Sequence, residues 1–267
     1  MKSRAREFVN SISPVIGREL MANFTNKLSQ IGETARNKLP QSATTVFTFK
    51  YNGGVIIAGD RRMVGGWYSL ESDREIKVKQ LSPHIALACS GYCSVIRYIE
   101  DNMETISSTF IQRFEKELSP DGAANYLRYL LEEWFFALLW LGYWAIGAPI
   151  LATYDIGPDK PRIFEFSEDG FFHEPQFVAG TGCGYSAVKH IIADECMRKG
   201  NMNENDAINL AMRAMFHSGI ASHGVSDIRL GLPTIGLIDR DGFRWVPEEE
   251  LKNERINVLT DLGETNA

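Results

Sequence analysis

The chain has 267 residues, of which 44% are hydrophobic and 23% charged, so it can bury the core of one domain with room for an appendage. Its 28 basic and 34 acidic side chains leave a formal net charge of −6, which argues against a nucleic-acid partner, because such binders usually present a basic face. The four cysteines and five histidines share no zinc-ligand spacing, so we expect buried reduced thiols in a cytoplasmic protein, with no metal and no cofactor.

Residues 1–43 differ in character from the rest of the chain. They are polar, carry a loosely amphipathic run and close on an extended stretch, Asn37–Ala43. No apolar core follows the basic opening residues, so we expect no secretory signal. Two interpretations stand: an ordinary N-terminal helix with a linker, or a leader that is cut away.

The next segment predicts a β-hairpin. Residues 45–51 alternate in the period-two pattern of a strand with two distinct faces. Asn52-Gly53 follows, a strong signal for a tight turn whose two central residues need positive φ. Residues 54–59 then return as a short apolar strand.

After an irregular segment to about Lys79, the pattern alternates between strands and pairs of helices. Strands are predicted over residues 84–90, 150–154, 162–166, 234–238 and 243–246, and helices over 93–117, 120–146, 184–199 and 204–218. Antiparallel strands with helices arriving in pairs predict an α+β fold, a four-layer αββα sandwich of two antiparallel sheets covered by helix pairs.

One uncharged segment is long enough to span a bilayer. It runs for 21 residues, from Trp134 to Tyr154. Gly142, Gly147 and Pro149 interrupt it, so we expect a buried helix followed by a strand, and no membrane partner. A helix with so much apolar surface must pack against more than one neighbour, and another subunit is a candidate.

The stretch TTVFTFKYNGGVIIAGDRR, residues 44–62, resembles the mature start of a proteasome β subunit, particularly the bacterial kind. In that family autocatalytic removal of a propeptide exposes a threonine, and a hairpin then leads to Gly-Asp-Arg. The resemblance continues more loosely to about residue 250. It implies a leader or propeptide over 1–43, a peptidase domain over 44–250 and a C-terminal tail over 251–267.

The resemblance identifies Thr44 as the nucleophile, and elementary chemistry explains the choice. A threonine hydroxyl needs a base, and an N-terminal threonine carries one in its own α-amino group, whose pKa is ordinarily near ~8. Only cleavage of the bond between Ala43 and Thr44 frees that amine. The adjacent Thr45 is a competing candidate, but the sixteen residues from Thr44 to Asp60 match the family. Ala43 stands where the family typically has glycine.

By the same resemblance, Asp60 holds a lysine close to Thr44, and the positive charge favours the deprotonated hydroxyl and amine. That lysine is Lys77 if one residue is inserted, and Lys79 stays open as an alternative. Gly91, after Ser90, corresponds to the glycine whose N–H stabilises the oxyanion.

Two further residues of the site follow from weaker parts of the resemblance. Thr181 replaces the serine of a Gly-Ser-Gly motif, and Ser222 takes the place of a later serine. The aspartate that usually accompanies that serine falls on Gly219, or on His217 with another gap, and Asp227 is offset.

The resemblance also indicates which residues line the first substrate pocket. The residues that fall where the family lines this pocket are Met63, Val64, Cys89, Cys93 and Arg97. The apolar and sulfur-containing side chains among them suggest cleavage after hydrophobic residues. Arg97 could instead favour cleavage after an acidic residue.

The resemblance implies a threonine endopeptidase for polypeptide substrates in stacked homo-oligomeric rings, capped by an unfoldase ATPase or by α-type ring subunits. A rival hypothesis is a non-catalytic ring subunit, motivated by the missing aspartate and by Ala43. A small-molecule amidase with the same N-terminal nucleophile is a third, but such enzymes more often begin with Cys or Ser.

Overall fold

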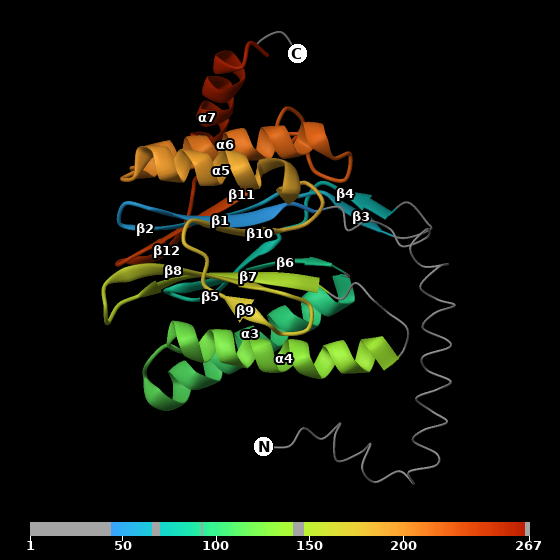
Figure 1. Ribbon diagram of the computed structural model, residues 1–267, viewed down its shortest axis with the longest axis vertical. Coiled ribbons are helices and arrows are strands. Elements are labelled where there is room, and N and C mark those ends of the chain that lie inside the picture. Colours follow the sequence, from blue (N-terminus) through green and yellow to red (C-terminus); the bar gives the residue numbers. More distant parts are fainter. Residues whose placement is uncertain (1–43, 66–69, 92, 141–146, 265–267) are drawn as a thin grey trace.

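The computed structural model describes residues 44–65, 70–91, 93–140 and 147–264. Within this part, two five-stranded antiparallel sheets are stacked face to face and helices cover their outer faces (Figure 1). The α+β fold and the four layers αββα are therefore confirmed.

The first sheet contains the predicted hairpin. Its strands, in spatial order, are β10 (Val178–Thr181), β1 (Val46–Tyr51), β2 (Gly54–Gly59), β11 (Thr234–Asp239) and β12 (Gly242–Trp245). In the hairpin Val46 pairs with Gly59 and Tyr51 with Gly54, and Gly53 in the turn has φ +96°. The expectation of positive φ at both central residues is wrong, since Asn52 does not have one, but the strands still pair directly across a two-residue turn.

The second sheet lies beneath the first. Its strands, in spatial order, are β5 (Val78–Ser82), β6 (Ile85–Gly91), β7 (Gly147–Asp155), β8 (Lys160–Phe166) and β9 (Phe172–His173). A separate ribbon joins β3 (Met63–Gly65) to β4 (Leu70–Ser72). The predicted irregular segment before Lys79 thus contains two short strands, and β5 already begins at Val78, because cross-strand partners elsewhere order residues that lack a local pattern.

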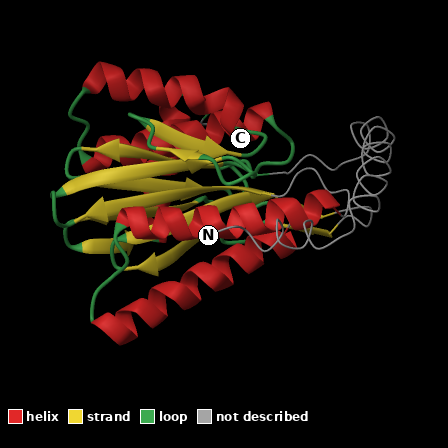
Figure 2. Cartoon of the chain, turned by 60° about the horizontal axis from the view of Figure 1, so that its bottom comes forward, coloured by secondary structure: helices red, strands yellow, loops and turns green. Residues whose placement is uncertain are grey.

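Helix pairs cover both sheets, as Figure 2 also shows. Helices α5 (Tyr185–Lys199) and α6 (Glu204–Ala221) pack on the first sheet, and α3 (Cys93–Phe114) and α4 (Pro120–Trp140) on the second. The uncharged segment divides as predicted into the end of α4 and strand β7, with residues 141–146 outside the described residues. None of the described helices is long and apolar enough to cross a membrane.

The strands alternate between two apolar layers. Phe47 and Phe49 face the layer under α5 and α6, whereas Val46 joins Val55 and Ile57 in the layer between the sheets. Both faces of β1 and β2 are buried, so a slip of one residue would exchange the two sets of side chains. This constraint holds the start of β1, and Thr44 before it, at one end of the sandwich.

The C-terminal segment contains a helix that the sequence did not predict. Helix α7 (Glu248–Asp261) packs on α6, with Leu251 and Val258 buried. It has only a weak amphipathic pattern, since most of its other residues are polar, and this explains why a tail was expected there.

Candidate functional site

The hairpin brings Asp60 back to the residue that follows Thr44. The Thr45 N–H donates to Asp60 Oδ1 at 2.8 Å, and the Asp60 N–H donates to the Thr45 carbonyl at 3.0 Å. Thr44 is buried, with 6% of its surface exposed. Asp60 therefore contacts the residue next to Thr44, because β1 and β2 are adjacent antiparallel strands.

Lys77, and not Lys79, meets Asp60. Lys77 Nζ lies 2.7 Å from Asp60 Oδ1 and also donates to the Arg62 carbonyl. Lys79 instead forms an ion pair with Glu104 at 2.9 Å. The structure thus resolves the alternative that the insertion left open.

Burial shapes the electrostatics of this pair. Lys77 is 8% and Asp60 1% exposed. Desolvation lowers the pKa of Lys77, and the Asp60 carboxylate opposes that decrease. Asp60 Oδ2 accepts from the Arg62 N–H at 2.9 Å and the Ser226 N–H at 3.2 Å, so the carboxylate is hydrogen-bonded on both oxygens, as a buried charge requires.

The loop between β10 and α5 holds the carbonyl of Thr44. The Gly184 N–H donates to it at 3.4 Å, and Cys183 Sγ lies 3.6 Å from the same oxygen. Gly182 has φ +99°, and a Cβ there would lie 2.1 Å from that oxygen. Only glycine fits this close approach.

Gly91, Thr181 and Ser222 all lie around this end of the sandwich. Gly91 ends β6 and lines the same cavity as Thr44. Thr181 Oγ1 lies 2.7 Å from Ser90 Oγ and so connects the two sheets beside Gly91. Ser222 Oγ lies 3.0 Å from Cys183 Sγ, which in turn contacts the Thr44 carbonyl, so Cys183 connects Ser222 to Thr44.

No carboxylate occupies the position of Gly219. A Cβ at Gly219 would lie 3.1 Å from the Ser226 carbonyl and 3.1 Å from Asp227 Cα, so backbone fills that space. The Asp227 carboxylate binds Arg229, with Nε 2.9 Å from Oδ2. The departure from the family pattern at Gly219 is therefore present in the fold as well as in the sequence.

A cavity of about 210 Å³ opens beside Thr44. Its walls include four of the predicted pocket residues: Met63, Cys89, Cys93 and Arg97. The side chain of Val64, the fifth, lies outside the described residues. The cavity has further lining residues that sequence reasoning missed, namely Glu75, Ile76, Ile96 and Glu100.

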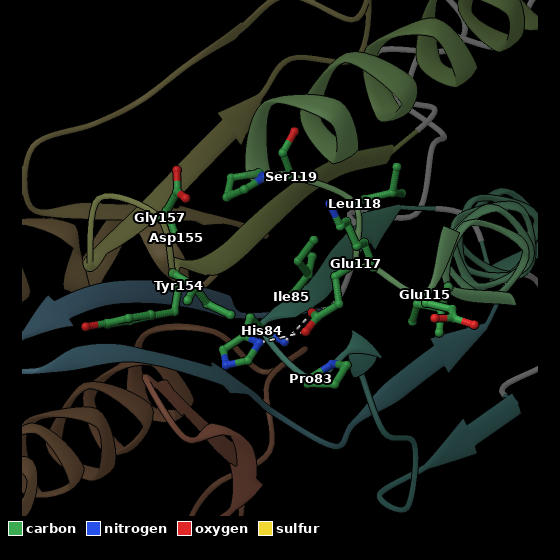
Figure 3. A pocket seen from close by; sticks show the side chains of 14 residues that line it. Pro83, His84, Ile85, Glu115, Glu117, Leu118, Ser119, Tyr154, Asp155 and Gly157 are labelled. Atoms are coloured by element: carbon green, nitrogen blue, oxygen red, sulfur yellow. Dashed lines mark hydrogen bonds and ion pairs between the residues drawn. The ribbon is translucent and has the colours of Figure 1, made fainter. Parts of the chain in front are cut away.

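A second cavity, of about 520 Å³, is larger but lies elsewhere (Figure 3). Its wall includes Ile85, the first residue of β6, whereas Gly91 at the other end of that strand lines the cavity with Thr44. A strand of this length spans roughly 20 Å. The larger cavity is therefore separate from the Thr44 site, although a hydrogen bond between His84 Nδ1 and Glu117 Oε1, at 2.8 Å, lies within it.

The thiols are not all buried as expected. Cys89 and Cys196 are buried, but Cys93 is exposed and Cys183 partly so. The prediction of burial is wrong for Cys93 because it is the first residue of α3 and lines the cavity beside Thr44. Across the described residues no cluster of His, Cys, Asp and Glu has a metal-binding arrangement.

Comparison with known proteins agrees with this geometry. The family model described as proteasome subunit matches residues 41–223. The chain is 31% identical over 239 residues to a proteasome subunit beta of Jonesia denitrificans, covering 85% of this chain and 74% of the relative. It is 27% identical over 226 residues to one of Streptomyces griseus (81% and 76%) and 26% identical over 258 residues to one of Frankia alni (90% and 90%).

Proposed function

The chain belongs to the proteasome subunit family as a β-type subunit, and we propose that it is a threonine endopeptidase activated by cleavage between Ala43 and Thr44. One observation carries the proposal. The buried Asp60 carboxylate binds the Thr45 N–H and the Lys77 ammonium together, which places a positive charge near the start of the mature chain.

In the proposed reaction the freed α-amine of Thr44 accepts the proton of its own hydroxyl, and Oγ attacks the peptide carbonyl. The charge of Lys77 favours the deprotonated form of that hydroxyl. The N–H of Gly91 donates to the developing oxyanion. The tetrahedral intermediate collapses to an acyl-enzyme with protonation and loss of the amine, and water then hydrolyses the ester and restores Thr44.

Thr181 and Ser222 support this arrangement without being placed on the reacting bond. Through Ser90 and Cys183 they hold the ends of β6 and of the β10–α5 loop against Thr44. Residues 1–43 would mask the amine until processing, residues 44–250 form the peptidase domain, and residues 251–267 follow it.

The family implies oligomeric ring assemblies, and confinement in a ring would restrict the activity to polypeptides that are fed into it. We propose stacked homo-oligomeric rings in the cytoplasm, with an unfoldase ATPase or α-type ring subunits as the partner that delivers substrate. No nucleic acid, membrane or cofactor enters the proposal.

Intact-mass measurement of the purified protein, combined with a peptidase assay, tests this function. We expect a mature chain beginning at Thr44 and hydrolysis of peptide substrates. Thr44→Ala should abolish both, whereas Thr45→Ala, its neighbour in the sequence, should leave some activity because Asp60 binds the backbone N–H of residue 45. A full-length inactive chain beginning at Met1 would contradict the proposal.

A non-catalytic ring subunit is the second candidate, and the geometry at Gly219 favours it. Backbone from Ser226 and Asp227 fills the space beside Gly219, and the Asp227 carboxylate binds Arg229. Ala43 at the junction points the same way, because glycine alone freely adopts unusual backbone angles. Peptidase activity and a processing pattern that are both unchanged in Thr44→Ala would favour this candidate.

A further inference from the structure

The wall of the cavity beside Thr44 includes one stripe of helix α3. Cys93, Arg97 and Glu100 follow one another at positions i, i+4 and i+7, which lie on one face of a helix. Cys93 and Arg97 are exposed, whereas Glu100 is only 6% exposed. The stripe therefore runs from the exposed Cys93, at the start of α3, to the buried carboxylate of Glu100.

Arg97 is the cation that pairs with Glu100, and the pair is loose. Arg97 approaches Glu100 at 3.7 Å and Glu75 at 3.6 Å, beyond hydrogen-bond range, and its side chain is 63% exposed. Lys79 pairs with Glu104 and Lys77 with Asp60. Besides the Lys77–Asp60 pair, the described lining of the cavity thus carries two carboxylates against one guanidinium.

Among the described residues Glu100 has the loose ion pair with Arg97, and no hydrogen-bond donor within 3.5 Å is described for its carboxylate. Desolvation raises its pKa, and the charge of Arg97 only partly offsets this. A buried carboxylate without close hydrogen-bond donors is costly, so a ligand that supplies such donors gains from it. The remaining wall, from Met63, Cys89 and Ile96, is apolar and suits an alkyl chain.

We infer that Glu100 is a specificity-determining residue that selects peptides with lysine or arginine on the acyl side of the cleaved bond. The inference rests on the proposed function, since it assumes that this cavity receives that residue. The alkyl part of the basic side chain would lie along the apolar wall, and its charged end would pair with Glu100. Both a purely hydrophobic side chain and an acidic one fit worse, because the first adds no hydrogen-bond donor for Glu100 and the second meets two carboxylates.

Peptides that end in lysine or norleucine provide the sharpest comparison, because norleucine keeps the alkyl chain of lysine and lacks the ammonium. We expect the protein as purified to bind the lysine peptide about tenfold or more tightly than the norleucine peptide. Calorimetric titration measures this without requiring turnover. A peptide ending in ε-N-acetyllysine should bind like the norleucine peptide, and one ending in glutamate should bind most weakly.

Variants then locate the effect. Glu100→Gln should reduce the preference for lysine to near unity, whereas Glu104→Gln, an exposed glutamate on the same helix, should retain it. Arg97→Gln should increase the preference because it removes the cation that competes for Glu100. This exposed substitution remains informative if Glu100→Gln fails to fold.

The outcomes separate this inference from the proposed function. Hydrolysis that favours norleucine or glutamate over lysine would overturn the inference and leave the peptidase intact. Equal binding of the lysine and norleucine peptides, or binding of neither, also overturns it. A lysine preference that depends on Glu100 in a protein without peptidase activity would support the inference and contradict the proposed function.

Discussion

Asp60 is the residue on which the described site converges. Four groups donate to its carboxylate: the Lys77 ammonium and the backbone N–H groups of Thr45, Arg62 and Ser226. Replacing such a carboxylate leaves the buried ammonium of Lys77 unpaired. The positions of Lys77 and of Thr45, the residue after Thr44, therefore depend on the same group.

Lys77 should limit activity at high pH. Its pKa is lowered by burial, so the proton that the proposed mechanism needs is lost below the ordinary lysine value as pH rises. The free α-amine must be deprotonated, which sets an acid limb near ~8. The pH profile of kcat/KM should thus be bell-shaped. Lys77→Arg should remove the alkaline limb, since arginine stays charged.

Lys79→Arg is the matched control for this profile. Lys79 lies two residues further along and pairs with Glu104 instead of Asp60, so its substitution should leave both limbs in place. An alkaline limb that survives Lys77→Arg at the same pH would contradict the role given to Lys77.

Two glycines with nearly the same backbone angle test the contact on Thr44. Gly182 has φ +99° and its Cβ would collide with the Thr44 carbonyl, whereas Gly53 has φ +96° and open space around it. Each substitution to alanine should cost about 1 kcal/mol through the backbone angle. Only Gly182→Ala should also abolish processing and peptidase activity, measured by intact mass and peptide hydrolysis. Equal activity of both variants would exclude a positioning role for the loop.

At the scale of elements, the hairpin β1–β2 and the strand β6 place the chemistry. Both end at the same end of the sandwich: β1 begins beside Thr44, β2 leads into Asp60, and β6 ends at Gly91. Helix α3 begins two residues later, so the cavity wall and the proposed oxyanion donor come from one continuous segment. A change in the phase of α3 would therefore alter the cavity without moving Thr44.

Helix α7 contributes stability instead of chemistry. Val258 is fully buried against the layer under α5 and α6, whereas Ile256, two residues before it, is 59% exposed. Val258→Ala should lower the free energy of unfolding by about 2 kcal/mol, and Ile256→Ala should change it by less than about 0.5 kcal/mol. Chemical denaturation measures both. Equal effects would mean that α7 does not pack on α6 as described.

For the whole molecule, membership of the family implies a ring, and assembly should be measurable directly. Native mass spectrometry of the purified protein should show a multiple of the subunit mass, which is 30.0 kDa for the unprocessed chain and less after cleavage. A monomer at micromolar concentration would contradict the proposed ring. Measuring Thr44→Ala in parallel separates assembly from processing, since only the latter should require the hydroxyl.

Local patterns in the sequence were enough to predict the layers and the hairpin that follows Thr44. The alternation over residues 45–51, the Asn52-Gly53 turn and the spacing to Asp60 are short-range features, and backbone geometry alone converts them into a hairpin. Helix pairs over residues 93–140 and 185–221 were likewise predictable from their length and periodicity. Strand β10 and helix α7 were missed, because they owe their order to neighbours distant in sequence.

The sequence by itself therefore determined that two stacked sheets carry Thr44 at the start of a strand and Asp60 near it. Only the tertiary structure decided that Lys77 and not Lys79 meets Asp60, that Cys183 lies between Ser222 and Thr44, and that Glu100 is buried in the cavity wall. The reason is physical. Which side chains meet across separate elements depends on how those elements pack, and spacing along the chain does not carry that information.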